Sequence, residues 1–124
     1  MSDEIATLYR IGTVVSVEGD LSTIRIEPDY IDGLYRIDTA NHLDILFWIP
    51  LDRGVLRVHP HGDPERRLRG VFSTRSPVRP NPIGLTRVKL VSHEGATIVV
   101  RGLDALIATA AVDIKIGEGP THGH

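Results

Sequence analysis

Short runs of β-branched and apolar residues follow one another along this 124-residue chain, and no 15-residue stretch has the 3.6-residue period of an amphipathic helix. Glycine, proline or charged residues bound each run, as is typical of strands in barrels and sandwiches. The pattern predicts an all-β fold: a small closed or partly open β-barrel of about seven strands, with short helical turns such as Pro28 to Gly33. Gly19-Asp20 is predicted to turn the first hairpin. We expect strands over residues 8–17, 21–26, 43–49, 55–59, 68–72, 83–91 and 97–101.

The composition excludes several classes of protein. Cysteine is absent, so disulfide frameworks, thiolate metal sites and a cysteine nucleophile are excluded. The strictly apolar run Ile45 to Ile49 is far shorter than the ~20 residues of a membrane helix, and the acidic start is unlike a secretory signal. We expect one domain over residues 1–124, in the cytoplasm and without membrane contact. Its tail, about residues 117–124, is predicted to be flexible.

The positive charge of the chain is concentrated in one segment. The formal net charge is −2, yet residues 65–89 carry seven arginine or lysine side chains and one acidic side chain. Fixed cations raise the local concentration of phosphate and carboxylate ligands. The segment is therefore an expected anion-docking site, with a solvated arginine-rich hairpin as the alternative.

The loop inside this segment is stiff. Prolines fix φ and keep the residues before them, Ser76, Arg79 and Asn81, extended. Arg75 and Arg79 offer forked donors to a carboxylate or phosphate, and the Asn81 amide offers a donor and an acceptor. A loop that is already ordered loses little entropy when it binds. The alternatives are pairing of the arginines with the acidic N-terminal half and a turn-stabilising role for the asparagine.

The stretch over residues 70–85 reads Gly-Val-Phe-Ser-Thr-Arg-Ser-Pro-Val-Arg-Pro-Asn-Pro-Ile-Gly-Leu. It resembles the signature of the TsaA-like domain family. Weaker similarity extends over most of the chain: to the opening strand (Tyr9 to Val14), to a segment with a histidine and a strand ending in an aromatic residue (Leu34 to Trp48, with His42), to a His-Pro turn (Val58-His59-Pro60), and to the closing segments at residues 103–105 and 112–115.

The resemblance implies a small β-barrel methyltransferase that uses S-adenosyl-L-methionine. The acceptor it implies is N6 of threonylcarbamoyl-modified adenosine beside the anticodon of tRNA. It also implies a homodimer with the methyl donor bound near the subunit interface. Two alternatives remain: methylation of a small-molecule nucleophile, and a non-catalytic barrel that binds nucleotide or RNA.

The same resemblance locates the expected site. We expect the cofactor to be bound by Arg75, Ser76, Arg79, Asn81, Ile83, Gly84 and Asp104. An amine acceptor must lose a proton, which requires a base. The expected catalytic residues are Asp104, Asp113 and Lys115. Asp113 and Lys115 share one strand face, which also fits a structural ion pair, and Asp104 also fits a plain turn. His42 is a weaker candidate base, more typical of a core or interface position.

The sequence departs from the family pattern near its closing segments, and it contains two pairs of closely spaced histidines. The family pattern carries an Asp-Gly-Thr-Pro turn before its Asp-Ile-Lys and a Pro-Tyr after it, whereas this chain has Leu106 to Ala111 and then Ile116-Gly117. The pairs His59/His61 and His122/His124 lack a further ligand at a recognisable spacing, so no metal site is predicted. Phe47 and Trp48 are expected in the barrel core.

Overall fold

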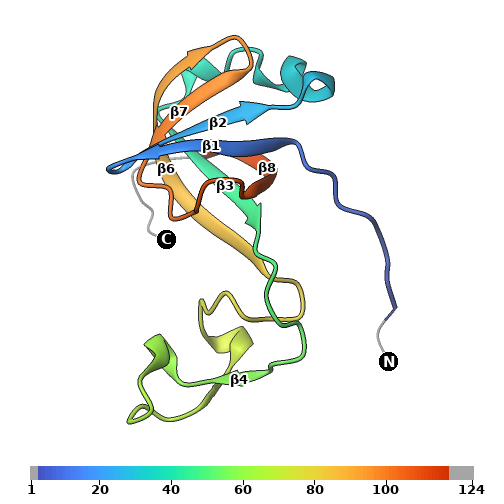
Figure 1. The fold of residues 1–124 in the computed structure, drawn as a ribbon, viewed down its shortest axis with the longest axis vertical. Helices are drawn as coiled ribbons and strands as arrows, with labels where there is room; N and C mark the ends of the chain where they lie inside the picture. The colour runs from blue at the N-terminus through green and yellow to red at the C-terminus, as the bar shows by residue number, and fades with distance from the viewer. Residues whose placement is uncertain (1–2, 118–124) are drawn as a thin grey trace. The chain divides into compact units, whose positions relative to one another are not determined.

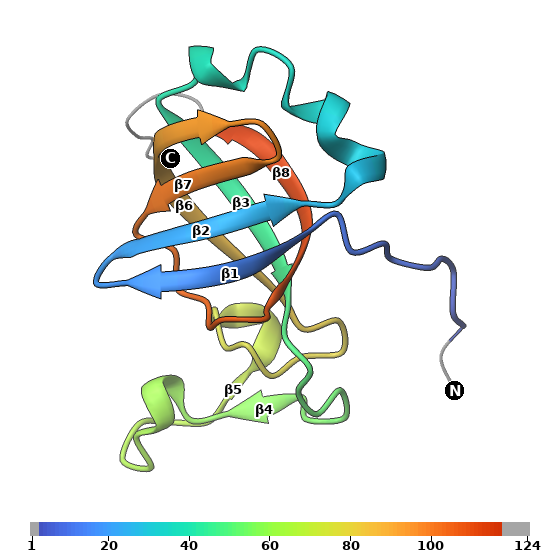
Figure 2. The ribbon, with the colours of Figure 1, turned by 45° about the horizontal axis from the view of Figure 1, so that its top comes forward.

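Six strands close into a ring in the computed structural model, which describes residues 3–117. The ring order is β1 (Gly12–Glu18), β2 (Leu21–Ile26), β7 (Thr97–Arg101), β6 (Ile83–Glu94), β3 (His42–Trp48) and β8 (Ala110–Gly117). Figures 1 and 2 show this ring from two directions. The predicted all-β barrel with short helical turns is confirmed.

Two hairpins build one wall of the barrel. β1 pairs with β2 through the predicted Gly19-Asp20 turn, and β6 pairs with β7 through a second turn at Gly95, where φ is 60°. The register shifts between Val14 and Ser16 in β1, and between Leu90 and Ser92 in β6. Such bulges increase strand twist, which helps a small sheet to curl closed.

Alternating side chains of these strands fill the barrel. In β3 every second residue is buried, namely Leu43, Ile45 and Phe47, while the residues between them are half-buried. Ile24 of β2 and Ile98 of β7 pair across the sheet and are fully buried. Each such side chain contributes about 1.5–3 kcal/mol through removal of apolar surface from water.

Two short 3-10 helices lie in the connection between β2 and β3. They are η1 (Pro28–Leu34) and η2 (Ile37–Thr39). Pro28 fits the first helical position because its missing N–H would have no partner there. Leu34 is the buried residue of η1.

The chain forms two compact units. The first is the barrel unit, which contains the chain up to Phe47 and from Leu85 onward; the second, the loop unit, is Trp48–Gly84. The loop unit contains β4 (Arg57–Val58), η3 (Pro60–Gly62), β5 (Arg69–Gly70) and η4 (Val71–Ser73). Val71 and Pro82 are buried within it. The single-domain organisation stays a prediction.

Several expected element bounds change. The first strand starts at Gly12 rather than Leu8, because residues 3–10 are exposed and lack ladder pairing. The strands expected over residues 55–59 and 68–72 shorten to the two-residue pair β4–β5. Trp48 is half-buried at the start of the loop unit, where the Arg53 guanidinium lies 5.5 Å from its ring centre, so its expected place in the barrel core is wrong.

No helix among residues 3–117 is long and apolar enough to cross a membrane. The tail expected to be flexible spans about residues 117–124; Gly117 is the last residue of β8, and residues 118–124 lie outside the described residues. His122 and His124 belong to this tail.

Candidate functional site: an arginine-lined cleft

The loop unit contains a cleft of about 540 Å³ bordered by basic side chains. We call it the arginine cleft. Its lining comes from η3, β5 and the proline-rich loop, by which we mean residues 74–82. The lining includes Arg66, Arg69, Arg75, His59, His61 and the hydroxyl residues Ser73, Thr74 and Ser76. Its size lies within the range of small-ligand sites, and its charge suits an anion.

The proline-rich loop is held by its own hydrogen bonds. The Thr74 hydroxyl donates to the Val71 carbonyl and accepts from the Ser76 backbone N–H, and the Ser76 hydroxyl accepts from the Val78 N–H. Arg79 Nη1 donates to the Ser76 carbonyl at 2.8 Å. These local bonds order the loop without help from a ligand.

The two signature arginines therefore have different surroundings. Arg79 is half-buried, and its Nη1 is engaged with carbonyls of the loop. Arg75 is exposed, lines the cleft and makes no hydrogen bond or ion pair with any other residue of the described range 3–117. Its five donors are available to a carboxylate or a phosphate.

A third arginine anchors the far end of the loop. Arg53 Nε donates to the Pro80 carbonyl at 2.6 Å, and its Nη2 donates to Asn81 Oδ1 at 2.9 Å. The same guanidinium lies over the Trp48 ring. Arg53 is the middle residue of a turn in which the Gly54 N–H donates to the Asp52 carboxylate. The sequence analysis missed this anchor because its partners lie 27 and 28 residues away.

The remaining residues expected to bind the methyl-donor cofactor lie at the end of the same loop. The Ile83 N–H donates to the Asn81 carbonyl at 2.7 Å, which bends the chain into β6. Gly84 is the second residue of β6 and is half-buried. Of the residues expected to bind the cofactor, Arg75 and Ser76 line the arginine cleft, whereas Arg79, Asn81, Ile83 and Gly84 belong to the same loop unit but not to the lining.

The proposed catalytic residues belong to the barrel unit. Asp104 is exposed in the connection between β7 and β8. In β8, Asp113 Oδ1 accepts the N–H of Ile114 at 2.8 Å, and its Oδ2 lies 3.5 Å from Lys115 Nζ. The Asp113–Lys115 side chains are half or more exposed, so this pair stabilises the fold by less than about 1 kcal/mol. His42 is half-buried in β3.

Perturbed pKa values in the described residues occur at barrel ion pairs outside the arginine cleft. Hydrogen bonding to Arg87 lowers the pKa of Asp44, across strands β3 and β6. Hydrogen bonding to Asp38 raises the pKa of His93. Among residues 3–117, no group of three or more histidine, aspartate or glutamate side chains is placed to hold a metal ion.

One departure from the family pattern has a structural signature. Ala108 has φ 77°, a left-handed conformation that favours glycine. It occupies the connection in which the family pattern has a glycine-containing turn. The adjacent residues Leu106 and Ile107 are exposed, the first at 80%.

The fold and the cleft define a class: a small β-barrel that carries an arginine-rich loop unit. The chain belongs to the family described as the tRNA-methyltransferase O N-terminal domain, whose model matches residues 13–116. The TsaA-like resemblance noted in the sequence is thereby confirmed.

Similar proteins carry related names. A probable S-adenosyl-L-methionine-binding protein of Methanothermobacter thermautotrophicus is 47% identical over 95 residues, covering 76% of this chain and 67% of that protein. An S-adenosyl-L-methionine-binding protein of Archaeoglobus fulgidus is 46% identical, covering 77% of this chain and 68% of that protein.

Solved structures agree on the fold. A TrmO crystal structure matches with a TM-score of 0.73 at 25% identity, covering 93% of this chain and 58% of that one. TrmO from Pseudomonas aeruginosa matches with a TM-score of 0.70 at 23% identity, covering 93% and 57%. The chain thus spans just over half the length of these TrmO chains.

Proposed function

We propose that this chain binds S-adenosyl-L-methionine through the arginine cleft and methylates N6 of threonylcarbamoyl-modified adenosine in tRNA. The observation that carries the proposal is the exposed Arg75, which has no partner among residues 3–117, on a loop ordered by Arg79 and Arg53. Family membership and the names of the relatives support the choice of cofactor. Because the proposed substrate is tRNA, we propose a cytoplasmic location.

The arginine cleft fits the anionic part of this cofactor. S-adenosyl-L-methionine supplies an activated methyl group on a sulfonium, so a covalent enzyme intermediate is unnecessary. The Arg75 guanidinium can bind the methionine carboxylate with two parallel hydrogen bonds. Arg79 and Arg53 keep the loop in its binding shape, which lowers the entropy cost of association. Ser76, Asn81, Ile83 and Gly84 form the rest of the proposed donor site.

Proton removal from the acceptor amine needs a base. We assign this role to Asp104 or Asp113, with Lys115, whose Nζ lies 3.5 Å from the Asp113 carboxylate, as the partner of Asp113. Asp104 is also proposed to contact the donor. Both carboxylates are at least half-exposed or exposed, so water can carry the released proton away.

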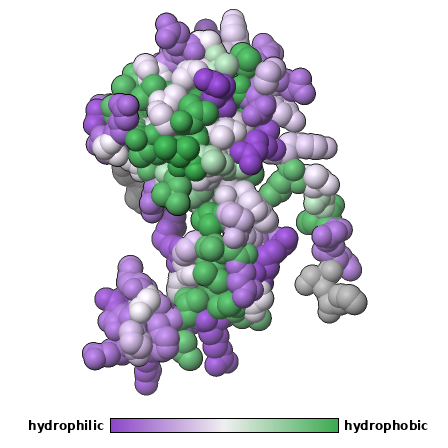
Figure 3. Space-filling model, in the orientation of Figure 1, coloured by the Kyte–Doolittle hydropathy of each residue, from purple (hydrophilic) through white to green (hydrophobic). Residues whose placement is uncertain are grey.

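We further propose that the active form is a homodimer. Large apolar side chains are exposed in both units, including Leu106 and Phe72 at 80% each. Figure 3 shows apolar side chains gathered on the visible face of the barrel unit. Exposed apolar patches of this kind typically mark interaction surfaces.

Transfer of a tritiated methyl group from S-adenosyl-L-methionine to total tRNA tests the proposed activity. We expect incorporation into tRNA that carries threonylcarbamoyl-adenosine and little into tRNA that lacks it. Arg75→Ala should reduce incorporation at least tenfold, since a charge-assisted bidentate contact contributes about 1.5–3 kcal/mol. Arg67→Ala is the matched control, because Arg67 is exposed but does not line the cleft.

A second acceptor class is favoured by one observation. The stretch Leu106 to Ala111, which leads into β8, departs from the Asp-Gly-Thr-Pro turn of the family pattern. This change favours a small-molecule nucleophile, or a barrel that binds RNA without catalysis. Incorporation into a small-metabolite extract but not into tRNA would select the former. Salt-dependent RNA binding without any methyl transfer would select the latter.

A further inference from the structure

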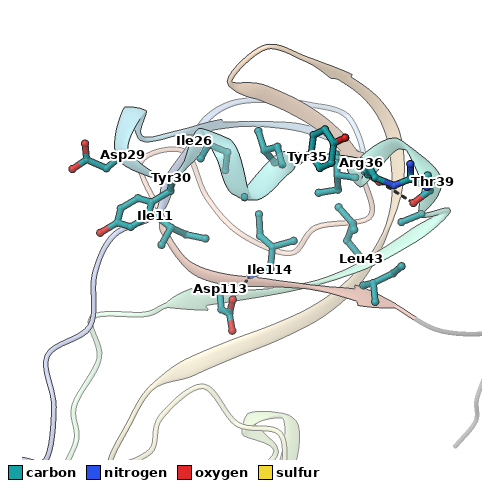
Figure 4. A pocket seen from close by; sticks show the side chains of 15 residues that line it. Ile11, Ile26, Asp29, Tyr30, Tyr35, Arg36, Thr39, Leu43, Asp113 and Ile114 are labelled. Atoms are coloured by element: carbon teal, nitrogen blue, oxygen red, sulfur yellow. Dashed lines mark hydrogen bonds between the residues drawn. The ribbon is translucent and has the colours of Figure 1, made fainter.

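A second cleft, in the barrel unit, shares no residue with the arginine cleft, and its lining includes Asp113, one of the two proposed bases. Its volume is about 520 Å³, and it lies between the η1–η2 connection and strands β2, β3 and β8. Figure 4 shows its lining, with side chains of η1 and η2 facing those of β8. We call it the tyrosine cleft. Its floor is aliphatic and deeply buried: Ile26, Leu34 and Leu43 are at most 4% exposed.

Aromatic side chains form part of the cleft border. The chain has three tyrosines, and two of them, Tyr30 and Tyr35, line this cleft. Tyr35 is 80% exposed and Tyr30 37%. A tyrosine so exposed gains little from folding. Its ring face is therefore available for a planar ligand.

Arg36 beside Tyr35 has a strained backbone. Its φ is 66° and its ψ 19°, a left-handed conformation that costs a residue with a side chain about 1–2 kcal/mol. The Thr39 hydroxyl donates to the Arg36 carbonyl at 2.8 Å and fixes this conformation. Within residues 3–117 the Arg36 guanidinium makes no hydrogen bond or ion pair with another residue. Strain maintained at a cleft border is a feature of ligand sites.

The charges of the cleft narrow the choice of ligand. Charged residues of both signs belong to the lining, namely Asp29, Asp113 and Arg36. In Figure 4 the carboxylates of Asp29 and Asp113 point away from the aliphatic floor, and Asp113 already contacts the Ile114 N–H and Lys115 Nζ. Two carboxylates beside the cleft disfavour a fatty acid or a free phosphate, whereas the Arg36 guanidinium suits ring nitrogens and carbonyl oxygens. An apolar floor, aromatic side chains and a guanidinium at the border together match a nucleobase.

We propose that the tyrosine cleft binds an unpaired purine base of the RNA substrate. This inference rests on the proposed function, which makes RNA the substrate, and it adds a base-binding subsite distinct from the arginine cleft. The cleft is large enough for a nucleoside. Tyr35 and Arg36 supply stacking planes at the border of the cleft.

Binding of adenosine and of a five-nucleotide single-stranded oligoadenylate tests the inference, with equilibrium dialysis and fluorescence anisotropy as the measurements. We expect Tyr35→Ala to weaken oligonucleotide binding about tenfold, because base stacking on an aromatic side chain is worth about 1–3 kcal/mol. Tyr35→Phe keeps the ring and should bind within about twofold of the unaltered chain. Tyr9→Ala is the control, since Tyr9 is 65% exposed and does not line the cleft.

Arg36→Gly separates binding from folding. The substitution removes the guanidinium and also relieves the positive φ, so we expect weaker adenosine binding together with a higher melting temperature. If Arg36→Gly raises the melting temperature but leaves adenosine binding unchanged, Arg36 has only a structural role and the role assigned to it is wrong.

Donor binding, measured by calorimetry on the same variants, distinguishes the two proposals. Tyr35→Ala should bind S-adenosyl-L-methionine normally. If the unaltered chain binds the donor but neither adenosine nor the oligonucleotide, or if Tyr35→Ala binds RNA as well as Tyr9→Ala does, the tyrosine-cleft inference is wrong and the donor site stands. If Tyr35→Ala loses RNA binding but the donor never binds, the base subsite stands and the proposed methyltransferase function fails.

Discussion

Replacement of Ala108 by glycine should stabilise this protein. The positive φ of Ala108 costs a non-glycine residue about 1–2 kcal/mol, whereas glycine gains unfolded-state freedom worth about 0.4–1 kcal/mol. Ala108 is exposed, so loss of its methyl group removes no buried surface. Its N–H donates to the Val14 carbonyl at 2.8 Å, and glycine keeps that bond. The net gain is about 0.8 kcal/mol, since relief of strain exceeds the entropy cost.

Urea unfolding followed by far-ultraviolet circular dichroism measures this gain. The midpoint should rise with an unchanged slope, and the melting temperature should rise by about 3 °C. Ala105→Gly is the matched control, because Ala105 lies in the same connection without a positive φ. It should lose about 0.4–1 kcal/mol. Equal destabilisation by both substitutions would refute the assigned backbone conformation.

Two further substitutions test the anchors of the loop and of η2. Arg53→Ala removes two hydrogen bonds to Pro80 and Asn81 and the contact with Trp48, so donor affinity measured by calorimetry should fall about fivefold while the melting temperature changes little; an unchanged affinity would show that the loop keeps its shape unaided. Asp38→Asn removes the partner that raises the pKa of His93 above its ordinary value of 6.5. The stability gained from a raised pKa is fully present below pH 6.5, and it is lost as the pH rises through the pKa of the folded state. Urea titrations should therefore show a loss of less than about 1 kcal/mol near pH 5.5 and none near pH 9, and an equal loss at both would contradict the assignment.

The barrel was predictable from local patterning where a strand pairs along most of its length, as β2 and β7 do. The strands over residues 21–26 and 97–101 were predicted with their observed bounds, and both lie next to each other in the ring. The first strand was predicted too long. Residues 8–11 have strand composition, but among them only Ile11 makes backbone bonds, with its N–H donating to the Ala111 carbonyl and its carbonyl accepting from the Glu27 N–H. Composition indicates what a segment can form; a partner strand decides whether it does.

The donor-site loop was predictable for a different reason. Its prolines and arginines are contiguous, so spacing alone indicated a stiff anion-binding segment. That Arg79 holds the loop while Arg75 stays exposed in the cleft was not predictable. The difference depends on which guanidinium donates to the carbonyls of Thr74 and Ser76. The Arg53 anchor depends likewise on folding that brings residues 53 and 80 together.

The tyrosine cleft left no local signal at all. Its floor combines residues of β2, η1 and β3, which are ordinary core residues when taken one at a time. Only the closure of the barrel brings Ile26 and Leu43 under Tyr35. A sequence motif search cannot find a site assembled in this way from tertiary contacts.

The account depends most directly on the arginine cleft as the donor site. Isothermal titration of S-adenosyl-L-methionine into the full chain, into Arg75→Ala and into Arg67→Ala tests that claim. We predict saturable binding to the unaltered chain, at least about tenfold weaker binding to Arg75→Ala, and unchanged binding to Arg67→Ala. Absence of heat with the unaltered chain at millimolar donor, or equal affinity for the two variants, would contradict it.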